Sequence, residues 1–165
     1  MNSGLDGRAA RRPPARARRR ADVAAGMRKN KIEVYIHLVW ATYHWQPLIN
    51  AAMDRQLYRV ISHEVQQCDC AVLALGGIET HCHLLTKTST AIRIADLVKQ
   101  VKGASSRFVN DALCPTDRFQ WQGCYGAFSV SRWDVEMIIH DIRNQQRHHQ
   151  ENSLMAEFEE TGFLD

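Results

Sequence analysis

The fold is decided by residues 70–88, which read CAVLALGGIETHCHLLTKT. Residues 70–78 form a continuous apolar run that ends at a pair of glycines, and this predicts a buried strand followed by a turn. Residues 81–88 predict a second strand close behind the first. Because the connection between them is so short, the two strands are expected to form an antiparallel hairpin at the centre of the molecule.

The segments on either side of this hairpin extend the pattern. Further strands are predicted at 31–42 and 125–131, and helices at 51–67, 92–102, 133–149 and 151–163. Gly103 is a good residue to end the helix at 92–102, although Ser105 and Ser106 could cap a continuation through Phe108. The order strand, helix, strand, strand, helix, strand predicts an α+β, ferredoxin-like βαββαβ antiparallel sheet with C-terminal helices.

The composition is that of a globular protein without a membrane span. The chain has 165 residues, of which 45% are hydrophobic, and no apolar stretch approaches the ~18 residues that cross a bilayer. The five cysteines form no C-x-x-C pair, so neither a disulfide framework nor a zinc ribbon is indicated. A reducing cytoplasm is the expected location.

The basic character of the chain lies in its first 26 residues. Seven Arg against two Asp give residues 1–26 a charge of +5, so the +3 of the whole chain leaves −2 for the remainder. Such an Arg-, Ala- and Pro-rich segment predicts a disordered tail ahead of a domain at 27–165. Three interpretations stay open: translated sequence upstream of a start at Met27, a DNA-binding arm, or a solvated tail.

The second hairpin strand carries a candidate metal site. Period-two alternation places His81 and His83 on one face and Cys82 on the other. Two imidazoles from one strand form a compact pair of ligands for a divalent metal. The alternative interpretation is two unrelated, half-buried histidines.

The helix predicted at 133–149 carries a second polar cluster. Asp141 and Gln145 are spaced i, i+4 and share a helical face, with His148 and His149 about one turn later. A carboxylate, an amide oxygen and imidazoles could complete a metal site together with the histidine pair. A solvated polar face is the alternative interpretation.

Aromatic and basic residues indicate contacts with nucleic acid. Trp121 and Tyr125 could stack on unpaired bases. Lys99, Lys102 and Arg107 lie along the second helix and its extension, where they could contact phosphates. Ordinary core packing and a cationic solvent face are the alternatives.

Taken together, the chain resembles one family, the single-tyrosine transposases of the HUH endonuclease superfamily, including those tied to REP repeats. The resembling segments are IHLVWATYHWQPLI (36–49), GGIETHCHLL (76–85), IADLVKQVKGASSRFVN (94–110), FQWQGCYGAFSVS (119–131) and DIRNQQRHHQENSLMAEF (141–158). They cover nearly all of 31–160, in order.

The resemblance implies a ferredoxin-like fold and a site for Mg²⁺ or Mn²⁺. His81, Cys82 and His83 match the HUH motif, and Gln145 matches the third metal ligand. In the family, a tyrosine one turn before that glutamine attacks a phosphate of single-stranded DNA with hairpin ends, and the strand is later rejoined. The resemblance also implies a homodimer, for which the apolar strand at 31–42 is expected to lie at a sheet edge and pair with its twin.

The chain departs from the family at the nucleophile. The family motif reads Tyr-Ile-x-Asn-Gln, whereas Asp141 begins the corresponding stretch here, and none of the four tyrosines lies in the last helix. Gly123-Cys124 also departs from an acidic-Gly pair. The leading interpretation is a DNA-binding, transposase-like protein with impaired strand transfer. The alternatives are a metal-dependent nuclease that uses water, with Asp141 or His140 activating it, and a domesticated DNA-hairpin-binding protein.

Overall fold

The computed structural model describes residues 31–145, and the described fold lies within the unit formed by residues 33–165. The predicted tail at 1–26 and the predicted helix at 151–163 lie outside the described residues. The elements are β1 (Tyr35–Ala41), η1 (Tyr43–Trp45), α2 (Asp54–Gln67), β2 (Ala71–Ile78), β3 (His81–Lys87), α3 (Ile94–Phe108), η2 (Val109–Leu113), β4 (Gly126–Val130) and α4 (Val135–Arg143). Their order confirms the α+β prediction.

The four strands form one antiparallel sheet in the order β2-β3-β1-β4. This is the strand order of the ferredoxin-like fold, as the sequence predicts. The expectation that the first strand lies at a sheet edge is wrong, because β1 is hydrogen-bonded to β3 on one side and to β4 on the other. Ile36 through Ala41 are all buried. A strand that is covered on both faces reads as a continuous apolar run, which explains its composition without an edge.

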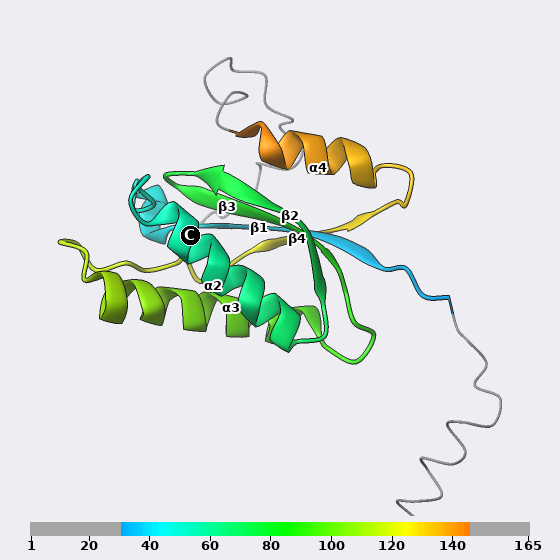
Figure 1. Cartoon of the computed structure of the whole chain (residues 1–165), viewed down its shortest axis with the longest axis horizontal. Coiled ribbons are helices and arrows are strands. Elements are labelled where there is room, and N and C mark those ends of the chain that lie inside the picture. Colours follow the sequence, from blue (N-terminus) through cyan, green and yellow to red (C-terminus); the bar gives the residue numbers. More distant parts are fainter. Residues whose placement is uncertain (1–30, 146–165) are drawn as a thin grey trace, which may run out of the picture. The chain divides into compact units, whose positions relative to one another are not determined.

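Helices cover both faces of the sheet (Figure 1). On one face, α2 and α3 enclose the larger core, to which the sheet contributes Leu38, Trp40 and Leu84. On the other face, α4 places Ile138 and Ile142 against Leu85. The alternation along β3 therefore sends Leu84 toward α2 and α3 and Leu85 toward α4.

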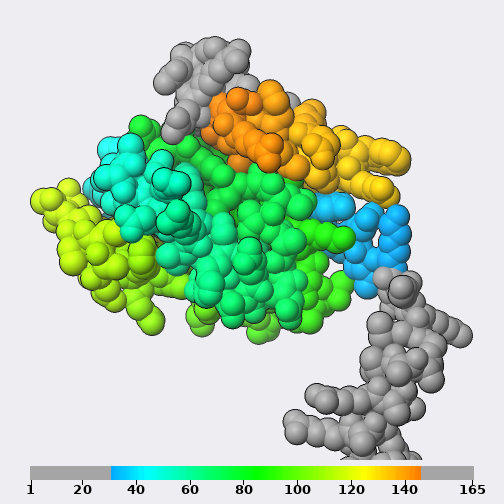
Figure 2. Space-filling model, in the orientation of Figure 1, coloured from blue at the N-terminus to red at the C-terminus, as the bar shows by residue number. Residues whose placement is uncertain are grey.

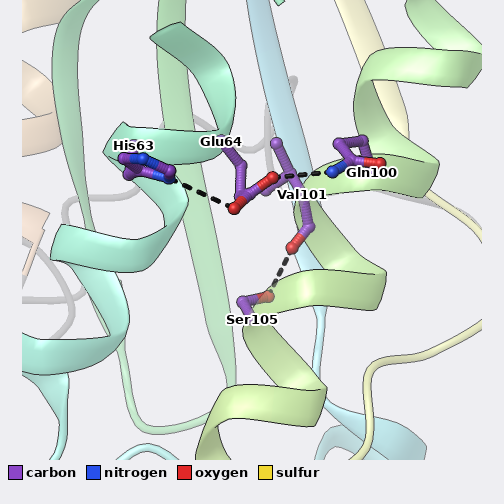
Figure 3. Close-up of polar contacts among 5 residues, drawn as sticks. All are labelled: His63, Glu64, Gln100, Val101 and Ser105. Atoms are coloured by element: carbon purple, nitrogen blue, oxygen red, sulfur yellow. Dashed lines mark hydrogen bonds and ion pairs between the residues drawn. The ribbon is translucent and has the colours of Figure 1, made fainter. Parts of the chain in front are cut away.

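Polar contacts join α2 to α3 at the edge of the larger core (Figure 3). Gln100 Nε2 donates to Glu64 Oε2 at 2.7 Å, and Glu64 Oε1 lies 3.2 Å from His63 Nδ1. Deeper in, Ser105 Oγ donates to the carbonyl of Val101 at 2.6 Å and accepts a hydrogen bond from Trp121 Nε1 at 2.9 Å. The Ser105 hydroxyl therefore lies inside α3, where it bonds the Val101 carbonyl and the Trp121 indole, and it does not cap the start of a helix.

Gly103 does not end α3, contrary to the sequence-based expectation. The helix continues to Phe108 and passes into the π-helical turn η2. Val101, Ser105 and Val109 are all buried and spaced four residues apart, so the face that packs on the sheet runs straight past Gly103. Tertiary packing thus overrides the local preference of a glycine to terminate the helix.

Replacing Gly103 by alanine is expected to stabilise the protein by about 0.5–1 kcal/mol, because glycine is disfavoured by this amount in a helix interior. A Cβ at this position meets no atom within 4 Å. Chemical denaturation of the wild type and Gly103→Ala would measure the difference. A loss of stability would indicate that Gly103 adopts the left-handed conformation of a helix end, as the sequence alone suggested.

No helix in the part of the chain that the structure describes is long and apolar enough to cross a membrane.

Candidate metal and DNA site

His81 and His83 lie on the same face of β3, as strand alternation predicts. Their ring centroids are 5.0 Å apart with planes at 67°. Both side chains are buried on the face that α4 covers, whereas Cys82 is fully buried in the core on the opposite face. Burial raises the pKa of the Cys82 thiol well above its usual range, so this residue is an inert part of the core.

A third histidine, His37 on β1, joins this pair. Its Nε2 lies 3.1 Å from His83 Nδ1, and the two rings stack with centroids 5.2 Å apart and planes at 25°. Burial lowers the pKa of His37 to about 4, so the ring is neutral at physiological pH. The contact fixes the orientation of the His83 ring.

His37 is not among the site residues predicted from the sequence. In the sequence it is a lone histidine within an apolar strand. No local pattern links it to its partner, His83, which lies 46 positions further along the chain.

His81 is held from the other side. Its Nδ1 lies 3.1 Å from Thr80 Oγ1, and the ring of Trp45 meets it edge to face at a centroid distance of 5.8 Å. Both imidazoles of the pair are therefore positioned by neighbouring side chains before any ligand arrives.

Helix α4 lies close against the hairpin at the level of the histidines. Gly76 of β2 stands opposite His83 in the strand register. A Cβ added to Gly76 would lie 2.7 Å from the carbonyl oxygen of Ile142 in α4. Glycine is required here because the helix backbone approaches the sheet more closely than any side chain allows.

Asp141 in α4 and Gln145, two residues beyond the end of α4, present buried oxygens on this face of the sheet. Gln145 is 9% exposed and continues the sheet-facing stripe of Ile138 and Ile142. Gln145 Oε1 and Asp141 Oδ2 are both buried and accept no hydrogen bond from the residues that the structure describes. The other oxygen of Asp141 lies 4.0 Å from His140 Nδ1. His148 and His149 lie outside the described residues.

The donor set fits a hard divalent cation. Neutral imidazole nitrogens, an amide oxygen and a carboxylate oxygen are ligands that Mn²⁺ accepts, and oxygen ligands suit Mg²⁺. Buried acceptor oxygens without a donor are rare in folded proteins and are satisfied by water or an ion. Between residues 31 and 145, no group of three or more His, Cys, Asp and Glu side chains is arranged to hold a metal. The expected set does not depend on such a group, because Gln145 is its third ligand.

Four of the five predicted DNA-contacting residues line one groove of about 370 Å³ between α3 and residues 120–125. They are Lys99, Lys102, Trp121 and Tyr125. The Lys102 ammonium group donates to the carbonyls of Gln122, Gly123 and Cys124, so it also fixes the wall of this groove.

The two aromatic rings of the groove differ in access. Trp121 is 5% exposed and packs against Phe119 and Trp40 in the core. Tyr125 is only partly buried, which leaves it the more accessible aromatic ring of the predicted pair. Arg107 lines a separate depression between α2 and α3, together with Arg59 and His63.

Comparisons with known proteins agree with this fold. The family described as Transposase IS200 like matches residues 30–145. A crystal structure of a protein from Deinococcus radiodurans R1, classed provisionally as a transposase, is 26% identical with a TM-score of 0.57, covering 72% of this chain and 98% of that one. The structure of a REP-associated tyrosine transposase bound to a REP hairpin is 11% identical with a TM-score of 0.56, covering 76% and 74%.

No curated protein sequence matches the chain. The family match nevertheless spans both the histidine pair and the end of α4, and the sheet has the predicted strand order. The chain belongs to the family of IS200-like transposases.

Proposed function

We propose that this chain binds single-stranded DNA with hairpin ends and holds a Mg²⁺ or Mn²⁺ ion with His81, His83 and Gln145. DNA strand cleavage and rejoining are impaired in this proposal, because Asp141 stands where the family carries its attacking tyrosine. The REP-associated tyrosine transposase with a similar fold is bound to a REP hairpin, and this supports the choice of DNA.

One observation carries the proposal. The two imidazoles share one sheet face at 5.0 Å, and α4 covers that face with two buried oxygens that accept no hydrogen bond from the described residues. An unsatisfied buried acceptor costs about 1–3 kcal/mol. A cation bound by Gln145 Oε1 and by the imidazoles would remove that cost for the amide oxygen.

The chain's own residues would set the properties of the ion. A bound ion would polarise the phosphate that is to be cut. His37 keeps His83 in the orientation for binding, and Thr80 does the same for His81. Asp141 places a carboxylate one helical turn from Gln145, which strengthens the attraction for a cation and repels an approaching phosphate.

The DNA contacts in this proposal lie in two places. Lys99 and Tyr125 of the groove would bind a phosphate and a base, with Trp121 supporting them from the core. Lys102, whose ammonium group donates to three backbone carbonyls, would attract phosphates through its charge. Arg107 would bind phosphates from the separate depression.

The proposed protein is still a homodimer, but the two copies do not pair through the strand at 31–42. Since β1 is internal, the strands at the sheet edges are β2 and β4. Within residues 31–145, each of these two strands pairs along one side only, so the open side of either strand offers a place where a second copy would add to the sheet.

The metal site is tested by Gln145→Leu, which keeps the bulk of the side chain and removes its oxygen. We expect Mn²⁺ affinity to fall about 10–100-fold, as for residues that complete a metal site. Without metal, stability should hold or rise, because an unsatisfied buried oxygen is gone. Calorimetric titration with Mn²⁺ and thermal melting in EDTA measure the two effects.

His63→Ala is the matched control, because this histidine is exposed and lies on α2, away from the sheet face that carries the pair. It should bind Mn²⁺ like the wild type. Equal Mn²⁺ affinity in the wild type and Gln145→Leu would remove Gln145 from the ligand set.

A further inference from the structure

The turn η1, which follows β1, has an uncommon backbone. His44 and Trp45 have φ values of 51° and 57°, so two consecutive residues with side chains adopt the left-handed conformation. L residues rarely do so, and such strain persists only where the surroundings enforce it. The turn also exposes aromatic rings, since Tyr43 is 40% and Trp45 is 41% exposed. A turn under this constraint holds the backbone that carries these rings at a fixed place on the surface.

Hydrogen bonds from both neighbouring segments enforce the turn. Thr42 Oγ1 donates to the carbonyl of Thr80, which directly precedes His81, at 2.9 Å. On the other side, Tyr43 N donates to the Gln120 carbonyl at 2.8 Å, and His44 N donates to Gln122 Oε1 at 3.2 Å. The turn is thus tied at once to the hairpin that carries the histidines and to residues 120–122.

These ties place η1 between the two candidate DNA-contacting regions. Trp45 meets His81 edge to face, and Gln120 and Gln122 belong to the groove that Lys99 and Tyr125 line. A single strand of DNA that takes the direct path from the groove to the histidine pair therefore passes η1. The segment that contains η1, cyan in Figure 2, lies at the molecular surface.

We propose that the indole of Trp45 is a stacking surface for an unpaired base of single-stranded DNA, next to the proposed metal site at His81 and His83. This inference rests on the proposed function and names the group that positions the strand there. An indole accepts any base, because every base has a π-face, so the site would hold the strand without reading its sequence. Tyr43, exposed in the same turn, lies beside the path of the strand.

The test uses three oligonucleotides in EDTA, so that metal binding does not enter. One is a DNA hairpin with a single-stranded flank of mixed sequence, one is the same hairpin without the flank, and one carries abasic sites in the flank. Trp45→Ala should bind the flanked hairpin about 10-fold more weakly than the wild type, the loss expected for one stacked base. Trp45→Phe should keep most of the affinity, whereas Trp45→Leu should not.

The abasic flank should reduce wild-type binding to the level of Trp45→Ala, and the hairpin without a flank should bind all variants equally. Trp133→Ala is the matched control, because Trp133 is also exposed, at 88%, but lies just before α4. It should bind the flanked hairpin like the wild type, and melting temperatures should show that each variant folds.

The outcomes separate this inference from the proposed function. If the wild type binds none of the hairpins, the proposed function fails. If the wild type binds and Trp45→Ala binds the flanked hairpin equally well, the stacking surface is wrong. Full binding by Trp45→Leu would also overturn it, since leucine can pack but cannot stack.

Discussion

The Asp141→Tyr variant is expected to form a covalent adduct with single-stranded hairpin DNA, and the native protein is expected to form none. Asp141 lies on α4, one turn before Gln145, at the position of the family's nucleophile. A carboxylate that attacked phosphorus would form a mixed anhydride, which water opens at the carbonyl carbon. A tyrosine forms a phosphate ester that survives until the strand is rejoined. Only the second intermediate accumulates.

The negative charge of Asp141 is a second reason to expect poor DNA cleavage by the native protein. Asp141 places a carboxylate near the proposed metal site, and one of its oxygens is buried without a hydrogen bond from the described residues. That charge strengthens binding of a cation and opposes the approach of a phosphodiester. Tyrosine removes the charge and supplies a longer nucleophile. Asp141→Tyr should therefore bind Mn²⁺ more weakly than the wild type and yet cleave DNA better.

A denaturing gel with labelled oligonucleotide and Mn²⁺ measures the adduct, and a parallel Mn²⁺ titration measures the affinity. Asp141→Phe is the control, because it removes the carboxylate without supplying a hydroxyl, and it should give no adduct. A wild-type adduct that survives denaturation and is lost in Asp141→Ala would show that aspartate is itself a nucleophile. Cut DNA without any adduct would favour the water-using nuclease.

The placement of the histidine pair could be predicted because it depends on local periodicity. Alternation along one strand fixes which of His81, Cys82 and His83 share a face, whatever the rest of the sheet does. Helical spacing likewise predicts that Asp141 and Gln145 share a side, although α4 itself ends at Arg143. The order of the elements was sufficient to predict the ferredoxin-like topology.

The errors and omissions concern contacts between distant segments. The partner of His37 comes from another strand, and the left-handed backbone at His44 and Trp45 is enforced by hydrogen bonds from two other segments. No local pattern contains this information. The misplacement of β1 at an edge was avoidable, since the nearly continuous apolar run at 36–41, IHLVWA, indicates a strand covered on both faces.

Replacing Gly76 by alanine is expected to displace α4 and weaken both folding and metal binding. The new Cβ would lie 2.7 Å from the carbonyl oxygen of Ile142 and 3.3 Å from its Cγ2. Neither the strand nor the helix backbone can give way locally, so α4 must move off the sheet. We expect a loss of about 1–3 kcal/mol in the free energy of unfolding, the usual cost of overpacking.

The metal site should report this displacement separately from stability. Gly76 stands opposite His83 in the sheet register, while Asp141 is on the helix that would move and Gln145 directly follows its end. A helix shifted by a few tenths of an ångström carries the oxygen ligands away from imidazoles that stay on β3, so Mn²⁺ affinity should fall along with stability. Gly103→Ala should leave Mn²⁺ affinity unchanged, because Gly103 lies on α3, on the other face of the sheet. The added methyl group would have no atom within 4 Å. If Gly76→Ala lost stability but bound Mn²⁺ like the wild type, the ion would be held by β3 and its neighbours without α4, and Gln145 could not be its ligand.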